Sequence, residues 1–88
     1  MSLQDKVFII TGGGSGIGRA SALLIAKKGA KIILVGRTLS KLQSVENEIS
    51  ATGGIARCFE LDVADSKTVA TMASTVIKEF GGVDVLVN

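Results

Sequence analysis

Short apolar segments that alternate with amphipathic segments are the feature that most limits how this chain can fold. Four segments are short, apolar and rich in β-branched residues, which is typical of buried strands; they are Val7–Ile10, Lys31–Val35, Ile55–Leu61 and Val83–Val87. Strands that alternate with helices pair in parallel through right-handed crossovers. The order βαβαβαβ therefore predicts one α/β unit over residues 1–88, a doubly wound parallel sheet in the strand order 3-2-1-4.

The segments between these strands carry apolar residues at helical spacing. The first helix is expected over about 17–28 and ends at Gly29, a residue type that commonly terminates helices. The second begins after Thr38 or Ser40, either of which is a suitable N-cap, and ends at the Thr-Gly-Gly sequence of 52–54.

The third helical segment has the clearest periodicity. Asp65 or Ser66 is its expected N-cap, and the glycines at 81–82 end it. Its apolar stripe repeats every three or four residues, so we expect the whole stripe to belong to the core; it consists of Val69, Met72, Ala73, Val76, Ile77 and Phe80. Cys58, inside the preceding strand, is expected to be a small buried hydrophobic residue.

The loop between the first strand and the first helix is the most informative segment of the sequence. Five of the eleven glycines lie there, at positions 12, 13, 14, 16 and 18. A glycine-rich turn between a strand and a helix is the context of a phosphate-binding loop, because the first N–H groups and the dipole of the helix attract an anion. Gly12 would make the turn, Gly16 would let the backbone approach a pyrophosphate, and Gly18 would let the helix pack close to the strand. A flexible turn without a ligand is the alternative.

Composition excludes several other kinds of site within these residues. The chain has no His, no Tyr, no Trp and a single Cys, so it can form neither an internal disulfide, nor a Cys/His zinc site, nor a serine–histidine–aspartate triad. Arg19 follows Gly18 where a Walker-type loop needs Lys. The ten basic and eight acidic residues are interspersed, which argues against nucleic acid as a partner. No apolar run approaches the roughly 20 residues of a membrane span, and we expect a cytoplasmic protein.

Three motifs, in order along the chain, resemble those of the short-chain dehydrogenase/reductase family. The first is Thr-Gly-x-x-x-Gly-x-Gly over 11–18, the second is Leu-Asp-Val at 61–63, and the third is the run from Phe80 to Asn88. The resemblance covers essentially all 88 residues. It implies a Rossmann-type dinucleotide-binding fold and a parent oxidoreductase, commonly a homo-oligomer, that transfers hydride between a nicotinamide and an alcohol or carbonyl substrate.

The end of the second strand predicts which dinucleotide binds. An acidic residue there normally bonds the ribose 2′-hydroxyl of NAD, but this sequence has Gly36 where NAD-preferring members of the family carry Asp. Arg37 can form a charge-assisted contact with the 2′-phosphate of NADP, and Thr38 can add a hydroxyl. We therefore expect NADP rather than NAD, with an exposed loop arginine as the alternative interpretation of Arg37.

Residues of the glycine loop and of the ends of the second and third strands are expected to bind the cofactor. In the family that the chain resembles, the residues that match Asp62 and Val63 contact the adenine, and a turn residue is a second role open to Asp62. The full expected set is Gly12, Gly14, Ser15, Gly16, Ile17, Gly18, Arg37, Thr38, Asp62 and Val63.

No catalytic or metal-binding residue is expected in the chain. The family's acid–base residues, a Tyr, a Lys, a Ser and an Asn, lie beyond the motif that Asn88 begins. We therefore expect a truncated NADP(H)-binding portion that is inactive alone, while the parent acts on a small molecule without nucleic acid or membrane as partner. A non-catalytic nucleotide-binding or interaction module is the main alternative, and a methyltransferase-like fold is a third. Truncation would expose the apolar fourth strand as an edge, which invites pairing with another chain.

Overall fold

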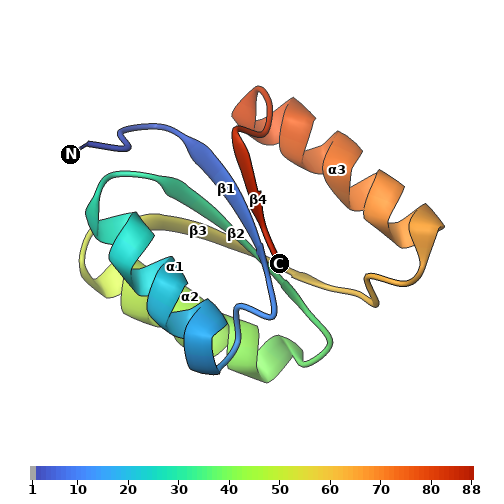
Figure 1. Cartoon of the computed structure of the whole chain (residues 1–88), viewed down its shortest axis with the longest axis horizontal. Coiled ribbons are helices and arrows are strands. Elements are labelled where there is room, and N and C mark those ends of the chain that lie inside the picture. Colours follow the sequence, from blue (N-terminus) through green and yellow to red (C-terminus); the bar gives the residue numbers. More distant parts are fainter. Residues whose placement is uncertain (1) are drawn as a thin grey trace.

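The computed structural model describes residues 2–88, and it places a four-stranded parallel sheet between helices on both faces (Figure 1). The strands are β1 (Val7–Thr11), β2 (Lys31–Gly36), β3 (Ile55–Glu60) and β4 (Val85–Val87). The helices are α1 (Gly16–Lys27), α2 (Leu39–Ala51) and α3 (Ser66–Phe80). The strands lie in the order β3-β2-β1-β4, and every neighbouring pair is parallel. The predicted fold class and strand order are confirmed.

Side chains that alternate along the two central strands build a core on each face of the sheet. Helices α1 and α2 cover one face and α3 covers the other (Figure 1). The core under α1 and α2 includes Phe8, Ile10, Ile32, Leu34, Leu42, Val45 and Ile49. The core under α3 consists of Val7, Ile9, Ile33, Val35, Met72 and Val76. Both central strands are thus buried on two faces, which explains why their sequences are almost continuously apolar.

Strand β4 is shorter than predicted, because Asp84 interrupts its regular pairing. The Asp84 N–H donates to the Val7 carbonyl at 2.9 Å, and the Asp84 carboxylate accepts from the Val7 N–H at 2.8 Å. The Asp84 side chain therefore accepts from the Val7 N–H, a backbone donor that a longer β1–β4 ladder would pair with a backbone carbonyl. Regular strand structure begins only at Val85.

Helix α3 shows where the predicted core is wrong. Met72 and Val76 are buried, but the Ile77 side chain is 56% exposed. Consecutive residues are separated by about 100° around a helix, so Ile77 lies on the flank of α3 when Val76 faces the sheet. The prediction that Ile77 belongs to the core is therefore wrong. Cys58 is likewise half-buried rather than buried, since it lies on the edge strand β3.

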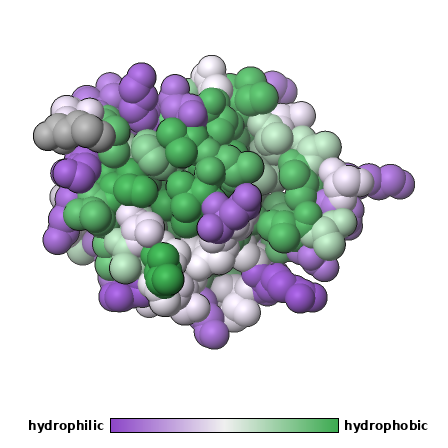
Figure 2. All heavy atoms as spheres, viewed as in Figure 1, coloured by the Kyte–Doolittle hydropathy of each residue, from purple (hydrophilic) through white to green (hydrophobic). Residues whose placement is uncertain are grey.

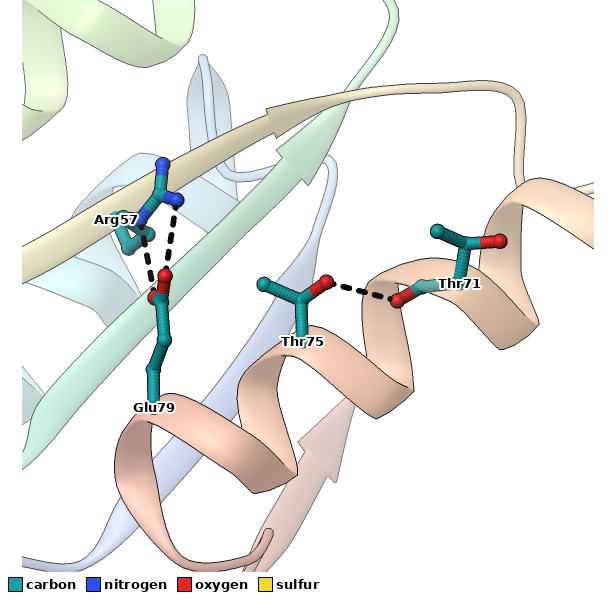
Figure 3. A network of polar contacts seen from close by, with 4 residues as sticks. All are labelled: Arg57, Thr71, Thr75 and Glu79. Atoms are coloured by element: carbon teal, nitrogen blue, oxygen red, sulfur yellow. Dashed lines mark hydrogen bonds and ion pairs between the residues drawn. The ribbon is translucent and has the colours of Figure 1, made fainter.

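Ion pairs attach helices to their neighbours at the surface of the molecule. Arg57 on β3 donates two hydrogen bonds of 3.2 Å to the Glu79 carboxylate near the end of α3 (Figure 3). Arg19 on α1 pairs with Glu48 on α2, with 2.7 Å between the nearest nitrogen and oxygen. Arg19 is therefore engaged with the second helix. No helix among residues 2–88 is long and apolar enough to cross a bilayer.

Candidate functional site

The glycine loop forms a sharp turn at the carboxyl end of β1. Gly12 has a φ angle of +68° and Gly16 has one of +59°, values in the left-handed region that glycine adopts with little strain. The Gly12 N–H donates to the Val35 carbonyl at 2.9 Å, which holds the start of the loop beside β2. The local fold thus depends on glycine at both positions.

Gly18 allows α1 to pack directly against the loop that precedes it. A Cβ atom at Gly18 would overlap with the carbonyl oxygen of Gly12, a backbone atom that cannot swing aside. A Cβ atom at Gly14 would lie 2.9 Å from the Cβ of Lys41 on α2. Gly18 was expected to let the helix pack close to the strand, and the close approach lies at Gly12, the loop residue that directly follows β1. Gly14 plays a similar part between the loop and α2.

The amino end of α1 presents backbone donors that have no protein acceptor. Arg19 is the first residue of α1 whose N–H has a backbone partner, the Ser15 carbonyl at 3.3 Å. Within residues 2–88, the N–H groups of 16–18 donate to no backbone oxygen, and the Ser15 side chain makes no capping hydrogen bond. Unpaired N–H groups together with the helix dipole favour an anion. The phosphates of a dinucleotide fit this arrangement.

A groove of about 240 Å³ lies between the glycine loop and the start of α2. The loop contributes Gly12, Gly14 and Ser15 to this groove. The opposite side is formed by the end of β2 and by the first turn of α2, through Gly36, Arg37, Thr38, Lys41 and Leu42. The structure therefore brings five of the expected cofactor residues together. Lys41 was missed, although a basic residue one helical turn after Arg37 was a usable signal.

Gly36 also has a packing reason to lack a side chain. A Cβ atom there would lie 3.2 Å from the Cδ2 atom of the buried Leu42. Position 36 therefore has little room for any side chain beside α2, a carboxylate included.

Arg37 extends into solvent and has one weak ionic partner. Its side chain is 81% exposed, and its Nη2 atom lies 3.8 Å from the Oδ2 atom of Asp62. An ion pair this long and exposed contributes little to stability, so the guanidinium remains free to contact an anion. The other Asp62 oxygen accepts a hydrogen bond of 2.9 Å from the Ala64 N–H, which is the turn role considered for Asp62.

Five of the ten expected residues do not line the groove: Gly16, Ile17, Gly18, Asp62 and Val63. Ile17 is 87% exposed, and its backbone N–H is one of the unpaired donors at the amino end of α1. Val63 lies on the α3 side of the sheet and lines a separate apolar hollow of about 310 Å³ with Thr11, Leu86 and Asn88 among others. Thr11 and Asn88 also meet there, with 3.3 Å between the hydroxyl and the side-chain carbonyl.

Glu60 is a residue of this region that the sequence did not reveal. Thr38 occupies the N-cap position of α2, but its side chain makes no capping hydrogen bond. Instead the Oε2 atom of Glu60, at the end of β3, accepts a hydrogen bond of 2.9 Å from the Leu39 N–H. Two basic residues, Arg37 and Lys41, and two acidic residues, Glu60 and Asp62, therefore lie around this part of the groove.

Comparisons with known proteins agree with this architecture. The family model described as short chain dehydrogenase matches residues 6–88. An uncharacterized oxidoreductase of Mycobacterium tuberculosis is 44% identical over 90 residues, which cover 99% of this chain and 26% of that protein. An uncharacterized oxidoreductase of Staphylococcus aureus is 40% identical over 86 residues, which cover 98% of this chain and 36% of that protein. The chain thus spans about a quarter to a third of the length of these relatives.

Solved structures show the same arrangement of elements. A citronellol catabolism dehydrogenase of Pseudomonas aeruginosa superposes with a TM-score of 0.93 at 38% identity, over 97% of this chain and 36% of that one. A metagenomic short-chain oxidoreductase in complex with NADP gives a TM-score of 0.93 at 38% identity, over 98% of this chain and 39% of that one. Since the family model matches nearly the whole chain, the chain belongs to the short-chain dehydrogenase family.

Proposed function

We propose that this chain is the NADP(H)-binding portion of an oxidoreductase that transfers hydride between a nicotinamide and an alcohol or carbonyl carbon. The observation that carries the proposal is the groove in which the glycine loop faces Arg37 and Lys41, with Gly36 in place of a carboxylate. Membership of the short-chain dehydrogenase family supports the reaction class. Homo-oligomerisation and a small-molecule substrate belong to the same proposal, and the cytoplasmic location stays a prediction.

The chain's own residues would bind and orient the cofactor. The N–H groups of 16–18 would hold the pyrophosphate, with Gly12, Gly14 and Ser15 beneath it. Asp62 and Val63 would contact the adenine. Bound NADP(H) would supply the carbon that accepts or donates the hydride, and no residue of this chain is assigned a proton-transfer role.

The preference for NADP over NAD rests on charge. Arg37 and Lys41 both line the groove beside Gly36, so a 2′-phosphate would meet two cations there, and none of the described residues that line the groove is acidic. Arginine binds phosphate through charge-assisted and often bidentate hydrogen bonds. The complex of one structural relative with NADP supports this choice.

Replacement of Arg37 tests the proposal, and the full-length gene product is the protein to use. We expect Arg37→Asp to weaken NADPH binding by at least about tenfold, because a hydrogen bond to a charged group contributes about 1.5–3 kcal/mol. NADH binding should change little. Fluorescence titration of both nucleotides measures the two Kd values.

Lys6→Asp is the matched control, since it makes the same change of charge at the opposite end of β1, where Lys6 is exposed. It should leave both nucleotides unaffected. An equal loss for NADPH and NADH in Arg37→Asp would show that Arg37 does not read the 2′-phosphate. Tight NADPH binding without oxidation of NADPH by any of a panel of carbonyl compounds would favour the non-catalytic module instead.

A further inference from the structure

Glu60 places a carboxylate at the amino end of α2. Its Oε2 atom accepts a hydrogen bond of 2.9 Å from the N–H of Leu39, the first residue of that helix. Glu60 is the last residue of β3, and it lies opposite Gly36 in the register between β2 and β3. The sheet therefore fixes the backbone from which this carboxylate reaches α2.

The carboxylate fills a position that favours an anion. The amino end of a helix has unpaired N–H groups and a partial positive charge. The Thr38 side chain, at the N-cap position, makes no capping hydrogen bond in the described part of the chain. Glu60 thus satisfies a donor that the helix's own N-cap residue leaves open.

A 2′-phosphate in the proposed groove would come close to this carboxylate. Arg37 and Thr38, the two residues expected to hold that phosphate, directly precede Leu39 and line the groove. A phosphate in contact with either residue would enter the field of the Glu60 carboxylate. Like charges separated by a few ångströms at a protein surface repel each other appreciably. NAD has a neutral hydroxyl at the same place and is not repelled.

We propose that Glu60 is a specificity-determining residue whose carboxylate lowers the groove's preference for NADP over NAD. The inference rests on the proposed function, because it concerns the same groove. Arg37 and Lys41 attract the 2′-phosphate and Glu60 opposes it. The ratio of the two affinities is therefore set by a balance of opposite charges and not by Arg37 alone.

Glu60→Gln tests the charge alone, because the amide oxygen still accepts from the Leu39 N–H. In the full-length gene product we expect this change to tighten NADPH binding by about three- to tenfold and to leave NADH binding within about twofold. The gain should shrink between low and high salt, since the affected groups are exposed. Calorimetric titration with NADPH and with NADH gives both Kd values.

Two further variants separate charge from stability. Glu48→Gln makes the same change where the carboxylate pairs with Arg19, and it should leave the ratio of the two affinities unchanged. Glu60→Ala removes both the charge and the hydrogen bond, so it should tighten NADPH binding as Glu60→Gln does and also lower the melting temperature.

The result that would overturn the inference is an unchanged NADPH-to-NADH ratio in both Glu60→Gln and Glu60→Ala while the wild-type protein binds the nucleotides. A wild-type protein that binds neither nucleotide would overturn the proposed function and this inference with it. The wild-type titration therefore distinguishes the two failures.

Discussion

At the scale of single residues, the three helices differ in what holds their amino ends. The Asp65 carboxylate caps α3 and accepts from the N–H groups of Lys67 at 3.0 Å and Thr68 at 3.3 Å. Helix α2 is capped by Glu60 from a neighbouring strand. Helix α1 follows the glycine loop, and Ser15 gives it no side-chain cap. The helix left without a protein cap is the one whose amino end we assign to the pyrophosphate.

Asp65→Ala should lower the free energy of unfolding by about 1 kcal/mol, because loss of an N-cap side chain costs about 0.5–2 kcal/mol. Urea denaturation of the full-length gene product measures the change. Thr38→Ala is the matched control at the N-cap position of α2 and should be close to neutral, since Thr38 makes no capping hydrogen bond. Equal losses from the two substitutions would show that the cap of α3 is not formed as described.

The contrast between these caps also shows how far a sequence predicts a site. Asp65 lies next to the helix that it caps, so local sequence was enough to name it as one of two candidates. Glu60 is 21 positions away from Leu39 along the chain. Its role depends on the sheet that brings β3 beside the end of β2, and a tertiary contact of this kind leaves no local pattern.

At the scale of elements, apolar periodicity predicted most of the side chains that pack against the sheet, but it did not predict which apolar side chains stay exposed. The continuous burial of β1 and β2 follows from their unbroken apolar runs, and the burial of Met72 and Val76 follows from apolar spacing. Ile77 fits the same spacing but lies on a flank of α3. Apolar spacing shows which side chains of a helix could be buried. Whether each of them is buried depends on which neighbouring elements cover it.

The contact between α1 and the glycine loop leads to a prediction for stability and for nucleotide binding. Gly18→Ala should lower the free energy of unfolding by about 3 kcal/mol, the upper part of the range for overpacking, because the new Cβ would meet the Gly12 backbone. It should also weaken nucleotide binding by displacing the amino end of α1. Chemical denaturation and nucleotide titration of the same variant check both effects.

Gly53→Ala is the control for this substitution. Gly53 has a φ angle of +83° and no atom within 4 Å of a built Cβ. Its replacement should therefore cost only the backbone strain, about 1–2 kcal/mol, and leave nucleotide binding intact. A Gly18→Ala protein as stable as Gly53→Ala would contradict the close packing of α1.

At the scale of the whole molecule, the described residues leave hydrophobic surface beside β4. Val83, Val85 and Leu86 are 41%, 39% and 60% exposed. Figure 2 shows a broad hydrophobic area in the middle of the molecule, over the region where Figure 1 draws the sheet. Strand β4 pairs with β1 on one side only. An apolar edge strand of this kind invites pairing with further β-structure.

Residues 1–88 produced alone should therefore self-associate at micromolar concentrations through the open edge of β4. Light scattering measures the mass in solution. Leu86→Lys places a charge on this edge and should shift the population toward monomer. A monodisperse wild-type monomer would contradict the expected role of this edge.

The relative affinity for NADPH and NADH tests the central claim most directly, because it depends on the glycine loop and on the charges of the groove together. It requires only the full-length gene product and two titrations. We expect both nucleotides to bind and NADPH to bind more tightly. Tighter binding of NADH, or binding of neither nucleotide, would contradict the assignment of this groove to NADP(H).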